Sequence, residues 1–444
     1  MQNDLSDGGT GLVAEPSDAL AAREYLDSLI LHGIKLGLSN IEAILREGGE
    51  PQYSCPVVHV GGTNGKGSVL AFLDAMLLAA GYRTGRFSSP HLLDVTERFL
   101  IDAVPVCNAT LEESAHWCQL MSARALCVPT YFEANTAMAF YCFQKKKVDV
   151  ALLEVGMGGR FDSTNVVQPR ICAITNIALD HTRYLGSTLA EIAFEKAGIL
   201  KKNIPAVLGR MDPEAQRVIE QEAAACAVPL FRWGIEYEAE KGGSPLTPVL
   251  TYRGNGKVFE NVQLGLAGMH QIENAAIALT VALQLQSDFP RLTDSAIISG
   301  LEKAVWPGRL ERLLDSPPVL MDVAHNPAGC AALVEAVDNC TAVFAVSSDK
   351  DAATMLALLK RIARPLILTC YTGERSLPLT ALRQFADSAQ CIIVPSLAEA
   401  LEAGKREASP EKPLLITGSI YACGEARDYM IRNWGVSAPA FRRS

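Results

Sequence analysis

The sequence predicts an α/β protein with two parallel, helix-covered β-sheets, the first in a larger unit than the second. Short apolar runs with the length and β-branched composition of strands alternate with helical segments, a pattern typical of parallel sheets. A strand, a glycine-rich turn and a helix follow each other directly within residues 57–81. A segment rich in proline and glycine at residues 307–318 then separates two series of strands.

The first unit begins after a polar, glycine-rich stretch, residues 1–18, which is predicted to be disordered. Residues 19–31 have helical periodicity. The strands expected in the first sheet are residues 57–60, 148–154, 171–177 and 205–208. Ligands of such sheets collect at the carboxyl ends of strands, so Ser68, Glu154 and Asn176 are expected to meet at one edge.

Residues 57–81, VVHVGGTNGKGSVLAFLDAMLLAAG, predict a phosphate-binding turn. Backbone N–H groups of residues 64–68 and the helix N-terminus would attract a polyphosphate, Lys66 would neutralise its oxygens, and the Ser68 hydroxyl would hold Mg²⁺. The spacing is unusual, because Val60 occupies the place of the first glycine of the common pattern and Gly67 separates Lys66 from Ser68. Strand, Gly-Lys pair, hydroxyl and helix agree, so nucleotide binding is favoured over a glycine loop without a ligand.

The amino-acid composition changes after Arg232. Several glycines and prolines and a hairpin-like stretch at 251–256 predict a small β excursion within the first unit. Residues 307–318 are predicted to be a hinge, which gives domains at 19–306 and 319–444. The strands expected in the second sheet are residues 319–323, 342–346, 366–369, 392–394 and 414–417.

Composition is that of a large soluble enzyme. The chain has 444 residues, 49% hydrophobic and 20% charged, enough to bury one or two full cores. A net charge of −9 without a long basic run argues against nucleic-acid binding. The 12 cysteines form no CxxC pair, so neither zinc nor disulfides are indicated. Without a signal peptide or about 18 consecutive apolar residues, a cytoplasmic protein that binds no membrane is expected.

The turn GTNGKGS at residues 62–68 resembles the phosphate loop of the folylpolyglutamate synthase and dihydrofolate synthase family, within the Mur ligase superfamily of ATP-dependent amide-forming enzymes. The resemblance continues in order along nearly the whole chain. The matching blocks are SSPHL (88–92), TER (96–98), TYFE (130–133), LLEVGMGGRFDSTN (152–165), TNIALDHTRYLG (175–186), EKAGILK (195–201), GMHQIENAAIAL (268–279), WPGRLE (306–311), MDVAHNP (321–327) and TGSIY (417–421). By these blocks the chain is identified as a member of the family.

The resemblance implies an N-terminal P-loop ATPase domain and a smaller, Rossmann-like C-terminal α/β domain. It also implies a two-step ligase, in which MgATP phosphorylates a carboxylate of dihydropteroate or a reduced folate and the amine of L-glutamate attacks the acyl phosphate. Length and the TYFE and RFDSTN blocks look like bacterial bifunctional members, which act in folate biosynthesis and one-carbon metabolism. We expect a monomer.

The catalytic metal sites follow from the chemistry and from the resemblance. Ser68 and Glu154 offer oxygen ligands for one Mg²⁺. His181 resembles the family's ligand for a second Mg²⁺, although a lone histidine is more often structural. Lys196 occupies the position at which the family carries a carbamylated lysine, a negatively charged metal ligand. An unmodified Lys196 could instead offset phosphate charge.

The nucleotide and substrate residues rest mainly on the resemblance. The residues expected at the nucleotide are Asn64, Gly65, Lys66, Gly67, Ser68, Asn274, Arg309, Asp322 and His325. Arg309 carries the planar cation suited to phosphate oxygens, Asp322 resembles the family's ribose-contacting acid, and His325 lies near the nucleotide or the incoming glutamate. Substrate contacts are expected from Leu36, Ser89, Thr130, Phe132, Asp162 and Ser163. Phe132 could stack on a flat ring or belong to the core.

One block departs from the family pattern. Relatives commonly carry a glycine-containing turn before Asp-Lys-Asp, whereas Ser347 and Ser348 precede Asp349, Lys350 and Asp351 here.

There are three alternatives to a bifunctional enzyme: a monofunctional folylpolyglutamate synthase, a cell-wall Mur ligase that uses the same mechanism on a nucleotide-linked peptide, and a nucleotide-gated scaffold without catalysis. The retained catalytic residues argue against the scaffold, and the GTNGKGS and SSPHL blocks argue against the cell-wall ligase.

Overall fold

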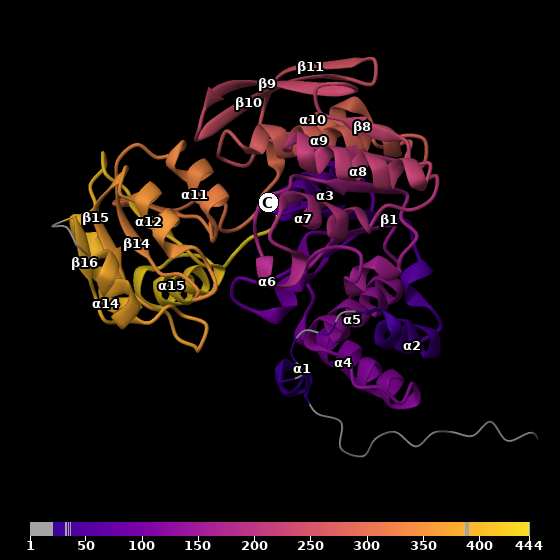
Figure 1. Cartoon of the computed structure of the whole chain (residues 1–444), viewed down its shortest axis with the longest axis horizontal. Helices are drawn as coiled ribbons and strands as arrows, with labels where there is room; N and C mark the ends of the chain where they lie inside the picture. The colour runs from indigo at the N-terminus through magenta and orange to yellow at the C-terminus, as the bar shows by residue number, and fades with distance from the viewer. Residues whose placement is uncertain (1–20, 32, 34, 36, 387–389, 444) are drawn as a thin grey trace, which may run out of the picture.

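The computed structural model describes residues 21–31, 33, 35, 37–386 and 390–443, and these form three β-sheets (Figure 1). The predicted α/β class is confirmed. The prediction of disorder for residues 1–18 lies outside the described residues. None of the described helices combines the length and apolar character needed to cross a membrane.

The large sheet has eight strands in the order β4-β3-β2-β5-β1-β6-β7-β8. From β2 to β8 neighbouring strands are parallel, while β3 and β4 form an antiparallel edge. The bounds are β1 Val57–Gly61, β2 Thr84–Phe87, β3 Phe99–Ile101, β4 Val104–Pro105, β5 Val150–Glu154, β6 Ile171–Ile174, β7 Ala206–Leu208 and β8 Leu230–Arg232. The central strands β1 and β5 are buried throughout, which explains their nearly continuous apolar sequences.

Helices cover both faces of this sheet, and alternate residues of each strand point to opposite cores. On one face, Val58 and Val60 of β1 pack in the core that holds α3 Lys66–Ala79, α9 Gln271–Leu285 and α10 Asp294–Lys303. On the other face, Val57 packs with helices α1 Ala22–Ile30, α2 Ser39–Glu47, α4 Asn108–Arg124 and α5 Tyr131–Lys146. Helices α7 Leu189–Ala197 and α8 Pro213–Ala225 build a further core over β6 and β7. The short elements are α6 Thr182–Leu185 and the 3₁₀ turns η1 Pro51–Tyr53, η2 Val95–Arg98, η3 Ser163–Val166 and η4 Arg383–Phe385.

A three-stranded antiparallel sheet packs on α9 at the outer edge of this unit (Figure 1). Its strands are β9 Tyr237–Ser244, β10 Thr247–Gly254 and β11 Lys257–Gln263. The β excursion predicted after Arg232 is therefore present, and Tyr252 and Phe259 anchor it in the core shared with α9.

The C-terminal sheet has six strands in the order β12-β13-β17-β14-β15-β16, all parallel except β12. The strands are β12 Glu311–Asp315, β13 Pro318–Met321, β14 Cys340–Phe344, β15 Ala363–Leu368, β16 Cys391–Ile393 and β17 Leu414–Thr417. The helices are α11 Pro327–Val334, α12 Ala352–Leu359, α13 Leu379–Leu382, α14 Leu397–Glu407 and α15 Ile420–Trp434. Within residues 307–318, the predicted hinge, the chain forms β12, which pairs with β13 and belongs to this sheet.

Candidate active site

The candidate phosphate loop lies between the carboxyl end of β1 and the start of α3. Gly62 and Gly65 have φ angles of 132° and 85°, which favour glycine. A Cβ atom at Gly62 would also clash with Thr175, and one at Gly65 would clash with Asn274. Because α3 begins at Lys66, the loop opens at a helix N-terminus, where backbone N–H groups attract anions.

Asn64 in this loop is pinned by residues that follow the adjacent strand β6. Its backbone N–H donates to Asn176 Oδ1 over 3.0 Å. Its carbonyl accepts from Asn176 Nδ2 at 3.0 Å and from Thr175 Oγ1 at 2.6 Å. The loop is thus held in one conformation before any ligand arrives.

Lys66 and Glu154 form the charged centre of the loop. Lys66 donates through Nζ to the carbonyls of Gly62 (3.2 Å) and Thr63 (3.1 Å), and Nζ lies 4.0 Å from Glu154 Oε1. Glu154 is buried at the end of β5. Burial raises the pKa of Glu154, and the nearby cations Lys66 and Arg309 oppose that rise.

Ser68 is the buried hydroxyl of the first turn of α3. Only 1% of its surface is exposed, and its Oγ has no hydrogen-bond partner in the described part of the chain. A buried polar atom without a partner is costly, which points to a ligand. Its oxygen suits Mg²⁺. The described residues contain no ready-made cluster of three His, Cys, Asp or Glu side chains for a metal.

Lys196 and His181 come from segments that follow β6. Lys196, in the last turn of α7, is buried and donates from Nζ to the Gly62 carbonyl over 2.9 Å. Burial, together with the charge of Lys66, lowers the pKa of Lys196 to about 7. His181 directly precedes α6 with φ 50°. Desolvation lowers the pKa of His181, and the positive charges of Lys350, Lys66 and Lys196 lower it further. The negative charge of Asp180 raises this pKa, but by less. The residue is still exposed to solvent.

Asn274, the predicted nucleotide residue of α9, lies against the phosphate loop at Gly65. Its Nδ2 donates to Gln271 Oε1 over 2.9 Å, and Gln271 in turn pairs with His270 at 3.1 Å. The start of α9 therefore carries three hydrogen-bonded side chains, His270, Gln271 and Asn274, and Asn274 contacts the phosphate loop.

Arg309 and Asp322 lie where the chain passes between the two large sheets. Both oxygens of Asp322 accept backbone N–H groups, from Leu310 (2.8 Å) and from Ala324 (2.9 Å). Burial raises the pKa of Asp322, and Arg309 opposes it. The charge of Arg309 acts on two buried carboxylates, Glu154 and Asp322. Asp322 thus orients the backbone next to Arg309.

Asp180 connects the two units through a polar network that sequence reasoning did not identify. It accepts from Lys350 Nζ at 2.7 Å and from Asn326 Nδ2 at 3.2 Å, and it lies 3.8 Å from His325 Nε2. Burial would raise the pKa of Asp180, but His181 and Lys350 outweigh burial and hold that pKa well below its usual range. Asn326 also donates to Asn64 Oδ1 over 3.0 Å, so the second unit contacts the phosphate loop directly.

The predicted substrate residues have varied surroundings. Leu36 lies outside the described residues. Thr130 caps α5 in a reciprocal capping box with Glu133. Ser89 donates its backbone N–H to Glu154 Oε2 at 3.4 Å, which places it beside the charged centre. Phe132 packs on Phe87, with ring centroids 5.8 Å apart, and against Gly156.

Asp162 caps the 3₁₀ turn η3, and Ser163 is the first residue of that turn. Asp162 accepts from the backbone N–H groups of Met157 (2.9 Å) and Thr164 (3.0 Å), so it holds the loop that follows β5. Ser163 is buried. The adjacent Phe161 was not among the predicted residues, yet 45% of its surface is exposed, which makes its ring accessible to a flat ligand.

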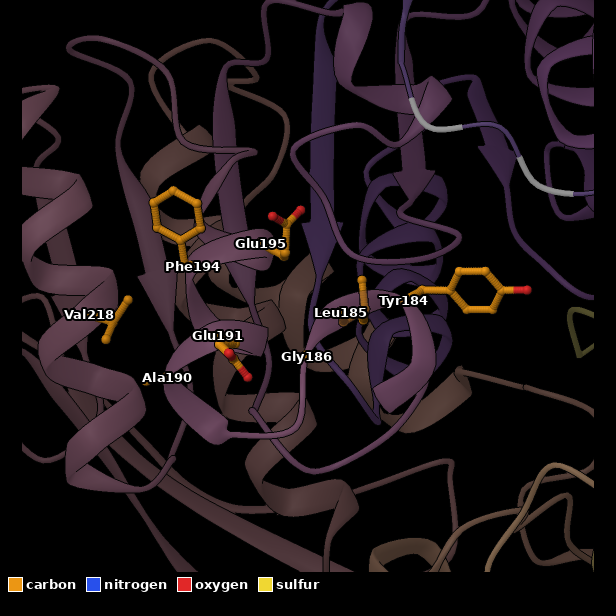
Figure 2. A pocket seen from close by; sticks show the side chains of 8 residues that line it. All are labelled: Tyr184, Leu185, Gly186, Ala190, Glu191, Phe194, Glu195 and Val218. Atoms are coloured by element: carbon orange, nitrogen blue, oxygen red, sulfur yellow. The ribbon is translucent and has the colours of Figure 1, made fainter.

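A surface hollow of about 510 Å³ is lined mainly by residues of α6, α7 and α8 (Figure 2). Tyr184 and Phe194 stand at opposite sides of it in Figure 2, and Glu191 lies between them. None of its lining residues is a predicted phosphate, metal or substrate residue. Glu191 is already engaged in capping α7, where it accepts from the backbone of Ser187 and Thr188.

Comparisons with known proteins cover most of the chain. Residues 60–282 match the Mur ligase middle domain and residues 308–420 match the Mur ligase glutamate ligase domain. The dihydrofolate synthase/folylpolyglutamate synthase of Bacillus subtilis is 33% identical over 421 residues, spanning 91% of this chain and 97% of the relative. The corresponding protein of Escherichia coli is 34% identical over 89% of this chain and 92% of its own length.

Solved structures give the same result. The folylpolyglutamate synthase of Mycobacterium tuberculosis, complexed with ADP and AMPPCP, superposes with a TM-score of 0.84 at 32% identity, covering 93% of this chain and 98% of that chain. E. coli FolC in complex with DHPP and ADP superposes with a TM-score of 0.83 at 30% identity, covering 94% of this chain and 100% of that one.

Proposed function

Because the chain belongs to the dihydrofolate synthase/folylpolyglutamate synthase family of Mur ligases, we propose that its site carries out that family's ATP-dependent addition of L-glutamate to folates in two steps. A free carboxylate is a poor electrophile, so the substrate carboxylate is first phosphorylated by ATP. The amine of L-glutamate then attacks the acyl phosphate and phosphate leaves. The observation that carries this assignment is the preformed phosphate loop, which leads into the first turn of α3. That turn carries Lys66 and the buried Ser68 hydroxyl, an oxygen without a hydrogen-bond partner among the described residues.

Phosphoryl transfer to a carboxylate brings two anions together, so the site must supply positive charge. Lys66 and the α3 N-terminus lie at the loop, and Arg309 of the linker is close enough to Glu154 to lower its pKa. Ser68 and Glu154 would hold a Mg²⁺ ion, and His181 with Lys196 would hold a second. When bound, Mg²⁺ neutralises phosphate charge and orients the transferred group.

Lys196 has the properties that a carbamylated lysine requires. A carbamate forms from a neutral amine and CO₂, and a pKa of about 7 leaves a substantial neutral fraction at physiological pH. The buried Nζ already lies at the Gly62 carbonyl of the phosphate loop. We therefore assign Lys196 as a carbamylated metal ligand.

The contacts between the two units protect the reaction from water. An acyl phosphate hydrolyses when water enters, so a closed site has a chemical purpose. Asn326 and Lys350 of the second unit reach Asn64 and Asp180 of the first. In this arrangement Arg309 of the linker, with Asp322 and His325 of the second unit, would bind the nucleotide from that unit's side. We propose that the two domains divide near the start of the predicted hinge, before β12.

Glu154→Gln and His181→Ala should impair the Mg²⁺ dependence of the reaction in different ways. Glu154 would share its metal with Ser68, whereas His181 would serve the other ion, so each change should raise the Mg²⁺ concentration needed for half-maximal rate. The measurement is a Mg²⁺ titration of initial rates at saturating substrates. Asp315→Asn, which alters an exposed carboxylate at the end of β12, serves as the control. Wild-type Mg²⁺ curves for both site variants would refute the metal assignments.

The chain is proposed to act both on dihydropteroate, adding the first glutamate, and on reduced folates, adding later ones. The alternative is a folylpolyglutamate synthase without the first activity. Steady-state phosphate release with glutamate and either dihydropteroate or tetrahydrofolate decides between them. Turnover of both acceptors is expected, and turnover of tetrahydrofolate alone would establish the monofunctional enzyme. A cytoplasmic monomer remains a prediction of the sequence.

A further inference from the structure

The segment that follows α15, residues 435–443, begins in the C-terminal unit. Gly435 ends the helix with φ 71°, and Val436 is buried in the core of α14 and α15. Arg427 of α15 donates to the Ser437 carbonyl through Nε (3.1 Å) and Nη2 (2.9 Å). The first half of this return segment is therefore fixed to the C-terminal sheet.

The other half of the return segment lies on the large unit, as the yellow trace that runs towards α3 shows (Figure 1). Phe441 is buried against Leu100 and Ala103, next to β3. Arg442 donates to the Asp102 carbonyl over 3.3 Å, and Arg443 donates to the Gly265 carbonyl over 3.2 Å. The chain thus crosses between the units a second time, in addition to the linker that carries Trp306 and Arg309.

The two crossings touch each other at Trp306. The rings of Trp306 and Phe441 meet edge to face, with centroids 5.7 Å apart. The guanidinium of Arg86 lies 4.5 Å from the centre of the Trp306 ring, and Arg86 is itself buried and paired with Asp74 of α3 at 3.2 Å. Stacking on a buried cation and packing against an aromatic edge both fix the position of an indole ring.

Trp306 also contacts the phosphate loop. A Cβ atom at Gly67, the residue between Lys66 and Ser68, would lie 2.8 Å from Trp306 Nε1. The indole therefore packs directly against the first turn of α3. Three residues beyond Trp306 the linker carries Arg309. Displacement of the indole would therefore alter both the loop and the nearby cation.

The same arginine that anchors the return segment also anchors the linker. Arg427 Nη1 donates to Glu311 Oε2 over 2.9 Å, and that oxygen accepts the Gly308 backbone N–H at 2.8 Å. The linker and the return segment are thus connected at two places. Arg427 connects them in the C-terminal unit, and the contact between Trp306 and Phe441 connects them at the phosphate loop.

We propose that residues 435–443 are a strap that holds the linker against the phosphate loop, and that Phe441 is a positioning residue for the nucleotide, acting through Trp306. This inference rests on the proposed ATP site. Removal of the Phe441 ring frees one side of Trp306, so that the Gly67 turn and Arg309 lose part of their preorganisation. Preorganised groups bind a ligand more tightly because less ordering is required on binding.

The test compares Phe441→Ala with Phe289→Ala in the full chain. Phe289 is buried to a similar extent and also meets an aromatic ring, Tyr82, at a centroid distance of 5.1 Å. Tyr82 lies beyond the opposite end of α3 from Gly67. Both variants should melt at lower temperature, because both lose a large apolar side chain. Only Phe441→Ala should raise the Kd for ADP, by about tenfold in isothermal titration, and Phe441→Leu should restore part of the affinity.

Three outcomes separate this inference from the proposed function. Absence of ADP binding by the wild-type chain would refute the ATP site and the inference with it. Wild-type affinity for ADP in Phe441→Ala, alongside a lowered melting temperature, would refute the strap alone. If Phe441→Ala does not fold, the same criterion applies to Phe441→Leu, in which an unchanged Kd for ADP overturns the proposal and a raised Kd supports it.

Discussion

Lys66→Ala should abolish turnover and leave the fold intact. Lys66 begins α3, lies 4.0 Å from Glu154 and currently donates to two carbonyls of the loop that would cradle the phosphates. A single charged donor in a preorganised site contributes roughly 3–4 kcal/mol to the transition state, so kcat should fall by about 10²–10³-fold or more. Glutamate-dependent phosphate release measures the rate, and circular dichroism with thermal melting checks the fold.

Lys257→Ala is the matched control for this variant. Lys257 is also a paired lysine, bound to Asp294 and to Gln286, but it belongs to β11. Its loss should leave kcat within about twofold of the wild type, as expected for a surface ion pair. A kcat near the wild-type value in Lys66→Ala would contradict the phosphate-loop assignment.

Lys196→Ala should be nearly inactive, and the wild-type rate should fall when CO₂ is removed and return when bicarbonate is added. The buried amine has a pKa of about 7, so it is available to CO₂ in its neutral form, and the resulting carbamate would give the site a negative oxygen ligand. Protonation of this amine competes with carbamate formation, so the CO₂ concentration needed to reach full rate should rise as pH falls towards 6. Initial rates in CO₂-depleted buffer, with and without bicarbonate, provide the measurement.

Two further variants separate a carbamate from a simple positive charge. Acetate or formate should partly restore Lys196→Ala, because a small carboxylate can occupy the vacated space and bind the metal. Lys196→Arg keeps the positive charge but cannot be carbamylated, so it should remain inactive. Full activity in Lys196→Arg, with an unmodified lysine in the intact mass of the active wild-type protein, would disprove the carbamate and leave the ligase function standing.

The phosphate loop could be predicted from sequence because its signals are local. The β-branched strand, the glycines and the Gly-Lys pair before an apolar helix all fall within residues 57–81, and β1 and α3 form there. The meeting of the loop with Glu154 and Asn176 could also be predicted, since β5 and β6 flank β1 and parallel strands share one carboxyl edge.

The contacts between the units could not be predicted in the same way. Asp180, Asn326 and Lys350 are polar residues in three separate segments, and no spacing in the sequence indicates that their side chains meet. The return segment is short and has no periodic pattern, so nothing local shows that Phe441 packs on Trp306. Such contacts depend on how two finished sheets dock.

Some local signals are compatible with more than one structure. The prolines and glycines at 307–318 indicate turns, but β12 lies between those turns and gains its hydrogen bonds from β13. A hinge prediction cannot anticipate a partner strand. Thr130 and Glu133 form a capping box at the start of α5, so the block TYFE has a structural role in addition to the substrate contact predicted for Thr130.

Transfer of oxygen from the acceptor carboxylate to phosphate tests the two-step ligase most directly. Dihydropteroate labelled with ¹⁸O in its carboxylate would be incubated with MgATP and L-glutamate, and both products analysed by mass spectrometry. The account predicts a glutamylated product together with inorganic phosphate that carries one ¹⁸O atom, because the carboxylate oxygen leaves with the phosphoryl group. Unlabelled phosphate, or phosphate release without a glutamylated product, would contradict it.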